Sequence, residues 1–211
     1  MQTSNFDYIN FNAKKIATTQ QVLKSRTAKI DLYKLTSKDN AFLQHLKENT
    51  SIAELMPNLP EHATKNWQDI LEFTINSAMD KKIKTFLALR NRKPCAIMTI
   101  QKNDDILNLL GIAAIPTDIN KKVKFAGLSL LCQLLKIAKS LNVRYVELEA
   151  VKNSHFNLIQ TYKKIGFDVV EQGEKYVSMS CNAQNIKQNL NNLVKKLGYK
   201  TILFEPDSKL Y

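Results

Sequence analysis

The sequence has few cysteines and no long apolar segment. Cys95, Cys132 and Cys181 are the three cysteines among 211 residues, and no two of them form a Cys-x-x-Cys pair. This spacing argues against a disulfide framework and against a zinc site, and it favours a reducing compartment. No apolar run reaches the roughly 18 residues of a membrane span, and residues 1–13 lack the pattern of a signal peptide. We therefore expect a cytoplasmic protein without a metal or a membrane partner; a secreted effector lacking an N-terminal signal would have the same pattern.

Acidic residues are scarce relative to basic ones. The chain has 31 Lys and Arg against 19 Asp and Glu, which gives a formal net charge of +12. Such a charge favours anionic partners, which include nucleic acid, an acidic membrane surface and a polyphosphate cofactor. The lysines are spread along the whole chain without a block of five or six like charges. Because a basic–aromatic signature is also missing, we do not expect nucleic acid as the main partner.

The remaining composition is that of one globular α/β domain with extensions, since 44% of the residues are hydrophobic. Residues 1–27 are predicted to form an N-terminal arm with a short helix near Lys14–Lys24. The domain spans residues 28–181, and residues 182–211 form an extension that packs on it. The extension contains an amphipathic helix and a short strand, which are expected at Ala183–Leu197 and Thr201–Phe204.

Alternation and helical spacing of apolar residues define the elements of the domain. The predicted strands are Ala28–Leu35, Lys84–Arg90, Pro94–Gln101, Ile106–Ile115, Val143–Val151, Phe167–Glu171 and Tyr176–Cys181; the predicted helices are Ala41–Glu48, Thr64–Met79, Gly127–Ser140 and Ser154–Lys164. The gaps between the second, third and fourth strands are of hairpin size, so these strands should be antiparallel neighbours. The strand after the Gly127 helix is reached by a crossover and should run parallel to Ile106–Ile115. The order predicts one mixed, mostly antiparallel sheet flanked by helices.

The turn between Ile115 and the Gly127 helix is the strongest candidate for a binding site. A helix that begins after a small, basic turn has unpaired N–H groups, and its dipole adds positive potential at the same point. The N–H groups of Phe125–Ser129 and the ammonium group of Lys124, with Lys121 or Lys122 as further charges, therefore predict a site for a diphosphate. The alternative is a solvated basic loop before an ordinary helix.

Two motifs within this order resemble the Gcn5-related N-acetyltransferase (GNAT) superfamily. The first is Lys124-Phe-Ala-Gly127-Leu-Ser129, which is similar to the family's diphosphate turn Gln/Arg-x-x-Gly-x-Gly/Ala but has Lys124 and Ser129 in place of the usual types. The second is Leu148-Glu-Ala150 followed by Tyr162-Lys-Lys-Ile-Gly166-Phe167, which matches the family's aromatic-x-x-x-Gly-Phe helix end. The asparagine that usually lies between these segments does not align cleanly. Counting forward from Leu148 indicates Ser154, and counting back from Tyr162 indicates His155. Asn153 is one residue away from the expected position.

The resemblance implies an acyl-CoA N-acyltransferase fold and transfer of an acetyl group from acetyl-coenzyme A to a primary amine of a small molecule or protein. It places the diphosphate on Lys124, Phe125, Ala126, Gly127, Leu128 and Ser129, with Asn153 and His155 nearby. It also implies that main-chain groups of Ala113, Ala114 and Ile115 hold the pantetheine arm where this strand splays from the next one. Gly111 is expected either to mark a bulge there or to allow close packing.

The resemblance also suggests catalytic residues. Tyr162 is the candidate acid for the leaving thiolate, although Leu158, Tyr162 and Ile165 share one helical face and Tyr162 could instead be a core residue. Glu149 is the preferred base, because it matches the glutamate that serves as base in the ribosomal-protein acetyltransferases. An exposed structural glutamate is the alternative, and Glu147, His155 or a water relay could replace it.

Two further possibilities follow from the same residues. An acyl-cysteine route would need an activated thiol, and Cys132 lies among leucines, where an inert buried thiol is expected. A catalytically weak or inactive module of the same fold, which binds coenzyme A or another anion and acts as an interaction protein, is the alternative function. The segments Met56–Met79 and Ala183–Tyr211 are expected to border the acceptor cleft or a homodimer interface.

Overall fold

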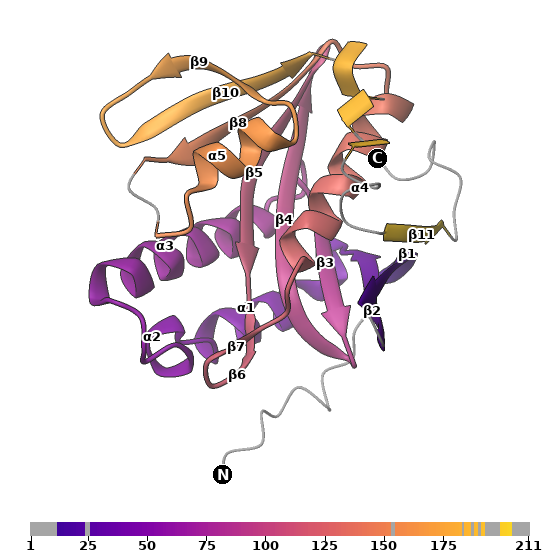
Figure 1. Cartoon of the computed structure of the whole chain (residues 1–211). Helices are drawn as coiled ribbons and strands as arrows, with labels where there is room; N and C mark the ends of the chain where they lie inside the picture. The colour runs from indigo at the N-terminus through magenta and orange to yellow at the C-terminus, as the bar shows by residue number, and fades with distance from the viewer. Residues whose placement is uncertain are drawn as a thin grey trace.

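The computed structural model describes residues 12–23, 26–152, 155–182, 184–186, 188–189, 191–192 and 199–203. Figure 1 shows that these residues form one sheet with helices on both faces. Within the described ranges, no helix is both long enough and apolar enough to cross a membrane. Residues 1–11 and 24–25 of the predicted N-terminal arm lie outside the described residues.

Eleven strands and five α-helices follow one another along the described chain. They are β1 (Lys14–Leu23), β2 (Arg26–Lys34), α1 (Asn40–Glu48), α2 (Ile52–Leu55), α3 (Glu61–Ala78), β3 (Lys84–Arg90), β4 (Lys93–Asn103), β5 (Ile106–Ala114), β6 (Pro116–Asp118), β7 (Lys121–Lys122), α4 (Ala126–Ser140), β8 (Tyr145–Val151), α5 (Leu158–Lys164), β9 (Asp168–Gln172), β10 (Tyr176–Asn182) and β11 (Tyr199–Leu203). A 3-10 turn, η2 (Ser37–Asp39), precedes α1. In the predicted C-terminal helix, the described residues 184–186, 188–189 and 191–192 are helical.

The sheet is mixed and mostly antiparallel, as predicted. Nine strands lie in the order β11-β1-β2-β3-β4-β5-β8-β10-β9, and β6 pairs separately with β7. In the nine-stranded sheet, β5 and β8 are the parallel pair among the described strands, and α4 forms the crossover between them. The predicted antiparallel arrangement of β3, β4 and β5 is confirmed.

Three local predictions differ from the structure. The helix expected near Lys14–Lys24 is strand β1, because this segment pairs with β2 and β11 and so becomes part of the sheet. The helix expected from Ser154 begins at Leu158, because Asn157 before it has a left-handed backbone with φ of 47°. The short helix α2 and the hairpin of β6 and β7 were not predicted.

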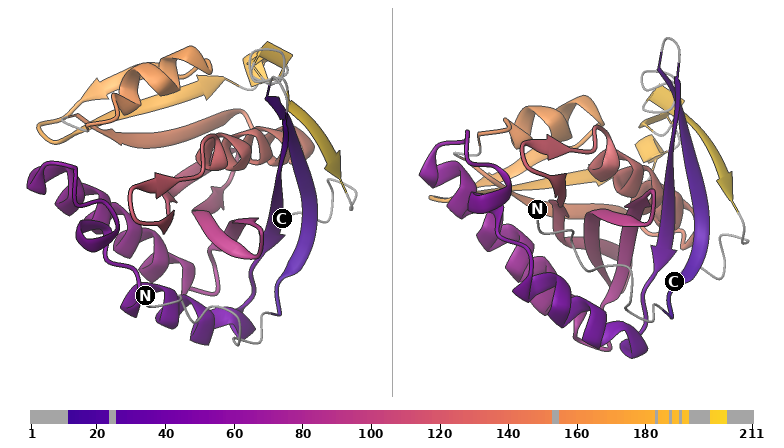
Figure 2. Two further views of the ribbon diagram at one scale, coloured as in Figure 1. Left: turned by 60° about the horizontal axis from the view of Figure 1, so that its bottom comes forward. Right: turned by 90° about the horizontal axis from the view of Figure 1, so that it is seen from below.

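Helices cover both faces of the sheet. Helices α1, α2 and α3 pack on one face of β3, β4 and β5, and α4 packs on the other face (Figure 2). Buried residues of β1 and of β10, near the two ends of the sheet, belong to the same apolar cluster as α4. The sheet therefore curves around α4 and holds this helix in a fixed position.

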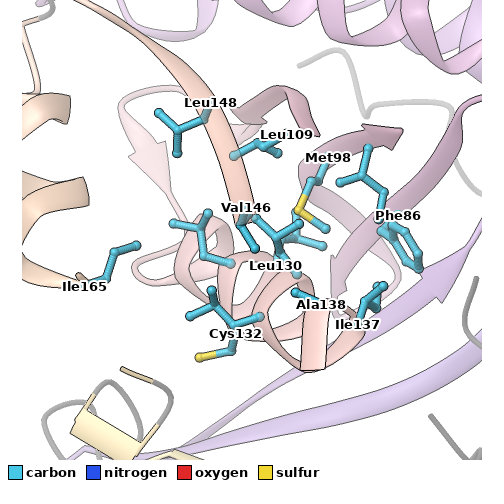
Figure 3. Packing of buried hydrophobic residues seen from close by; sticks show 14 of the residues in the cluster. Phe86, Met98, Leu109, Leu130, Cys132, Ile137, Ala138, Val146, Leu148 and Ile165 are labelled. Atoms are coloured by element: carbon cyan, nitrogen blue, oxygen red, sulfur yellow. The ribbon is translucent and has the colours of Figure 1, made fainter. Parts of the chain in front are cut away.

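The apolar residues of α4 form the centre of this core. Leu130, Leu134 and Leu135 are completely buried, and Figure 3 shows Leu130 among side chains from β4, β5 and β8. Fully burying a leucine side chain stabilises a fold by about 1.5–3 kcal/mol. Because apolar packing fixes α4 on the sheet, the position of the helix N-terminus is also fixed.

Strands β5 and β8 part after a short parallel ladder. Their pairing runs from Ile106 opposite Tyr145 to Leu109 opposite Leu148, and β5 continues beyond it to Ala114. At this point β5 also carries a bulge, because the register with β4 shifts between Leu109 and Gly111. The bulge and the parting of the strands together open the sheet next to the start of α4.

Gly111, directly after the bulge, allows β5 to approach α3 closely. A Cβ atom at Gly111 would collide with Thr74 Oγ1 and would lie 3.1 Å from Thr74 Cβ. The Thr74 hydroxyl donates to the carbonyl oxygen of Ile70 at 2.7 Å, so it is held in place. Both predicted explanations of Gly111 therefore apply, since the residue adjoins a bulge and permits close packing.

We expect Gly111→Ala to destabilise the fold by about 1–3 kcal/mol, because the added methyl group overpacks the contact with Thr74. Urea unfolding of Gly111→Ala, Thr74→Ala and the double variant measures this coupling. Gly127→Ala is the control, since the nearest atom to its added Cβ is Ile112 Cδ1 at 4.0 Å. Strictly additive losses in the double variant would show that the contact with Thr74 does not cause the effect.

Candidate functional site

A cavity of about 390 Å³ lies where β5 and β8 part. Its walls come from α3, the end of β5, the segment from β7 into α4, the last residue of β8, and α5 with the segment that leads into it. Elements far apart in the sequence therefore meet at the gap in the sheet.

The edge of β5 presents alternate peptide groups to this cavity. The N–H of Ile115 donates to the carbonyl oxygen of Cys95 in β4 at 3.0 Å, so Ile115 and Ala113 direct their main-chain groups toward β4. The main-chain groups of Ile112 and Ala114 consequently face the gap. This geometry narrows the predicted pantetheine contacts: of Ala113, Ala114 and Ile115, Ala114 has the suitable direction, and Ile112 joins it.

Trp67 of α3 borders the same edge of β5. Its indole N–H donates to the carbonyl oxygen of Ala114 at 2.7 Å, and the ring lines the cavity. The bond ties α3 to the end of β5 and satisfies one carbonyl that faces the gap. The N–H of Ala114 and the main-chain groups of Ile112 are then the groups that β5 offers to a ligand.

The start of α4 has no side-chain cap. Phe125 is the N-cap residue, with a left-handed backbone at φ of 67° and a side chain that cannot accept a hydrogen bond. Its carbonyl oxygen accepts from the N–H of Ser129 at 2.9 Å, whereas the described part of the chain supplies no acceptor for the N–H groups of Gly127 and Leu128. Both residues line the cavity. An anion is the natural acceptor for such groups.

Ser129 lies apart from the other predicted diphosphate residues. Its hydroxyl also donates to the carbonyl oxygen of Phe125, at 3.0 Å, and its side chain is completely buried. Lys124, Phe125, Ala126, Gly127 and Leu128 all line the cavity, and Ser129 does not. In the structure, Ser129 stabilises the first turn of α4 through its two hydrogen bonds to the Phe125 carbonyl oxygen.

The ionisable groups that line the cavity, apart from one phenol, are basic side chains. Lys122, Lys124 and His155 line it, and no carboxylate does so among the described residues. Lys122 Nζ lies 4.1 Å from the centroid of the Phe156 ring and 5.9 Å from that of Trp67. Burial against these rings lowers the pKa of Lys122. A cavity with this lining favours an anionic ligand with apolar parts.

Tyr162 is a core residue that also lines the cavity. The residue is 5% exposed, belongs to the apolar core and meets Phe167 edge-to-face with ring centroids 6.0 Å apart. It also lines the cavity. Burial raises the pKa of Tyr162 to about 12, so the phenol keeps its proton at neutral pH. A protonated phenol at the cavity wall can donate a hydrogen bond or a proton.

The two glutamates of β8 lie outside the cavity lining. Val146, Leu148 and Ala150 face α4, so Glu147 and Glu149 project from the opposite face of the strand. Glu149 is exposed and stands opposite Ser178 of β10. A proton transfer from a group in the cavity to Glu149 would therefore need water as an intermediary.

The loop after β8 is described in part. Asn153 and Ser154 lie outside the described residues. His155 lines the cavity, and its ring meets Phe156 edge-to-face at 5.3 Å. The choice among the three candidates for the family's asparagine stays open.

Sequence reasoning missed Ile112, Trp67 and Phe156 as cavity residues. The helical spacing of Trp67 indicated a core position, and this reading is also correct, since the residue is 6% exposed. Phe156 follows a turn whose shape the sequence pattern does not specify. The alternation of β5 could have indicated Ile112 once the hydrogen-bonding register with β4 was known.

All three cysteines are buried, as was expected for Cys132. Cys95, Cys132 and Cys181 are free and buried. Burial raises the pKa of Cys132 to about 12, which keeps the thiol protonated and unreactive. No group of three His, Cys, Asp or Glu residues within the described ranges is arranged to hold a metal ion.

No model of a known protein family matches this sequence, and no curated protein matches it. Solved structures do match. The chain is similar to FdhC, a nucleotide-linked sugar GNAT, with a TM-score of 0.54 and 14% identity over 90% of this chain and 99% of that one. It is similar to the PaiA N-acetyltransferase from Thermoplasma acidophilum in complex with coenzyme A, with a TM-score of 0.50 and 17% identity over 72% and 98%. It is also similar to a chimaera of the spermidine N-acetyltransferase SpeG from Vibrio cholerae and hSSAT, with a TM-score of 0.51 and 15% identity over 75% of this chain and 98% of that one.

These likenesses establish the architecture. The chain has the fold of the Gcn5-related N-acetyltransferases, which confirms the fold class and the resemblance predicted from the sequence. Function has to be argued from the cavity, because one fold can carry several activities.

Proposed function

We propose that this protein is an N-acetyltransferase that moves an acetyl group from acetyl-coenzyme A to a primary amine. The observation that carries the proposal is the convergence of three features on one cavity. These are the uncapped N–H groups of Gly127 and Leu128, the gap-facing edge of β5 and the protonated phenol of Tyr162. Each feature suits a different part of an acyl-coenzyme A molecule.

The start of α4 is suited to the coenzyme's diphosphate. The N–H groups of Gly127 and Leu128 supply directed hydrogen bonds, and the dipole of a 15-residue helix adds positive potential. Lys124 adds a full charge at the rim of the cavity. The missing side-chain cap at Phe125 supports this assignment, because a capping side chain would compete with the ligand for the same donors.

The parting strands are suited to the pantetheine arm. The N–H of Ala114 and the main-chain groups of Ile112 can bond the arm's amides in the way that a neighbouring strand would. Trp67 limits this ladder, because its indole N–H already occupies the carbonyl oxygen of Ala114. The arm would thus lie along the edge of β5 and bring the thioester into the interior of the cavity.

Tyr162 is the proposed acid. When the acceptor nitrogen displaces the coenzyme's sulfur, a thiolate develops and needs a proton or a hydrogen bond. The buried phenol is protonated at neutral pH and stands in the cavity wall. The edge-to-face contact with Phe167 restricts the orientation of the phenol ring.

Glu149 is the proposed base, acting through water. The acceptor must lose a proton to become a nucleophile, and a lysine-like amine has a pKa of about 10.4. Glu149 is exposed on the face of β8 opposite α4, where a solvated acceptor and its waters have access. Glu147 lies on the same face two residues earlier and is the natural substitute.

The acceptor is proposed to be a small molecule or a protein with a primary amine, met in the cytoplasm. The similar structures include a spermidine acetyltransferase and a nucleotide-linked sugar enzyme, so this fold serves acceptors of very different chemistry. The three free cysteines fit a reducing compartment. The second candidate function, a module that binds coenzyme A without turnover, is favoured by the position of Glu149 outside the cavity lining.

Coenzyme A and acetyl-coenzyme A are expected to raise the melting temperature of the protein, since a ligand that binds the native state stabilises it by mass action. Lys124→Glu should weaken the binding about tenfold or more, because a charged hydrogen bond worth roughly 1.5–3 kcal/mol becomes a repulsion. Differential scanning fluorimetry over a coenzyme titration measures both effects.

Lys139→Glu is the matched control for this experiment. Lys139 lies in the last turn of the same helix, far from the cavity. Its substitution by Glu changes the net charge of the protein by the same amount as Lys124→Glu. The proposal fails if millimolar coenzyme leaves the melting temperature of the unmodified protein unchanged. An equal loss of binding in both variants would contradict the assignment of Lys124.

Tyr162→Phe should retain coenzyme binding and slow acetyl transfer by about 100-fold or more, the usual scale for removal of a general acid. The assay follows release of the free thiol over a panel of amines and peptides, and the melting shift with coenzyme checks binding in the same variant. Turnover equal to that of the unmodified protein would exclude Tyr162 as the acid. Binding without turnover for every acceptor in both proteins would favour the non-catalytic module.

A further inference from the structure

The cavity already contains a primary amine, which belongs to the chain itself. Lys122 of β7 lines the cavity together with Tyr162 and the gap-facing residues of β5. Its Nζ lies over the Phe156 ring at 4.1 Å and near the Trp67 ring at 5.9 Å. The two rings are 5.3 Å apart at an angle of 85° and form two walls around the amine. Aromatic walls of this kind are a common way for proteins to hold amine ligands.

The surroundings of this amine contain no acidic partner. Of the described residues that line the cavity, none is a carboxylate, and no ion pair of Lys122 is present in the described part of the chain. Removal of a proton from Nζ therefore breaks no salt bridge. Burial lowers the pKa of Lys122, which increases the fraction of neutral, nucleophilic amine.

The preceding lysine has a different environment and provides an internal comparison. Both lysines of β7 are exposed residues, but Lys121 differs in that its Nζ pairs with Asp118 Oδ2 at 3.1 Å. It does not line the cavity. Two lysines adjacent in sequence thus differ in whether they enter the cavity.

We propose that Lys122 is itself an acetyl acceptor, which this protein modifies within the same molecule. The inference rests on the proposed function, because the thioester of acetyl-coenzyme A has to lie in the cavity that Lys122 enters. The aromatic corner of Trp67 and Phe156 is then the position at which an acceptor amine meets the thioester, and Lys122 occupies it in the free protein.

The reaction is balanced without a further reactant. The lone pair of Lys122 Nζ attacks the carbonyl carbon of the thioester, so that a C–N bond forms and the C–S bond breaks. Nζ gives up a proton to water, and the sulfur takes a proton from the phenol of Tyr162. Water then returns a proton to the Tyr162 phenolate. The products are an acetylated Lys122 and coenzyme A with a free thiol.

Tandem mass spectrometry can follow acetylation of Lys121 and Lys122 separately after the full chain is mixed with acetyl-coenzyme A. Because the amine is held in the cavity, we expect the initial rate at Lys122 to exceed that at Lys121 by about tenfold or more. The fraction modified per unit time should not depend on protein concentration, since the reaction is intramolecular. Both lysines are exposed residues, so unselective chemical acetylation would not produce a difference of this size.

Two substitutions and a denatured control sharpen the result. Lys121→Arg should leave the rate at Lys122 unchanged, and Lys122→Arg should leave Lys121 at its slow chemical rate. In urea the preference for Lys122 should disappear. The inference is overturned if Lys121 reacts as fast as Lys122, if the rate at Lys122 rises with protein concentration, or if the preference persists in the unfolded chain.

The melting temperature of the same samples separates this inference from the proposed function. A melting shift with coenzyme A together with equal rates at the two lysines would overturn the inference and leave the proposed function intact. Without any melting shift, the proposed function fails, and with it the reason for acetylation at Lys122.

Discussion

The separation of β5 from β8 is the constraint on which the rest of the site depends. Pairing between these parallel strands ends at Leu109 and Leu148, and the bulge before Gly111 then redirects β5. An unpaired strand edge inside a sheet exposes main-chain groups that need partners. In this protein those groups face a cavity, where Trp67 satisfies one carbonyl and a ligand can satisfy others.

The packing of α4 determines what lies at the end of this gap. The helix is buried between the sheet and the curved end strands, so apolar contacts hold it rigidly. Its first turn lacks a capping side chain, and the N–H groups of Gly127 and Leu128 consequently remain available at the cavity. Like the whole chain, which has a net charge of +12, the described cavity lining is basic, because it contains lysines and no carboxylate. A stable core and an anion-binding end are thus two consequences of the position of one helix.

Much of the fold could be predicted from the sequence, since periodicity identifies long apolar elements well. The stripe of α4 and the strands β3 to β5 are examples, and the crossover rule gave the parallel pairing of β5 and β8. The strand β1 could not be predicted in this way, because its pairing with β2 and β11 decides its conformation. The turn before α4 and Tyr162, which the two motifs singled out, line one cavity, and their roles stay predictions. Trp67, Lys122 and Phe156 were beyond sequence reasoning as a group, because tertiary packing brings α3, β7 and the loop before α5 together.

We propose that the gap between β5 and β8 holds an acyl-coenzyme A with its diphosphate on the start of α4. A crystal structure with bound coenzyme A tests it most directly. We expect diphosphate oxygens within hydrogen-bond distance of the N–H groups of Gly127 and Leu128, the pantetheine arm against Ile112 and Ala114, and the sulfur beside the hydroxyl of Tyr162. A coenzyme bound elsewhere, or one whose diphosphate lies away from the first turn of α4, would contradict it.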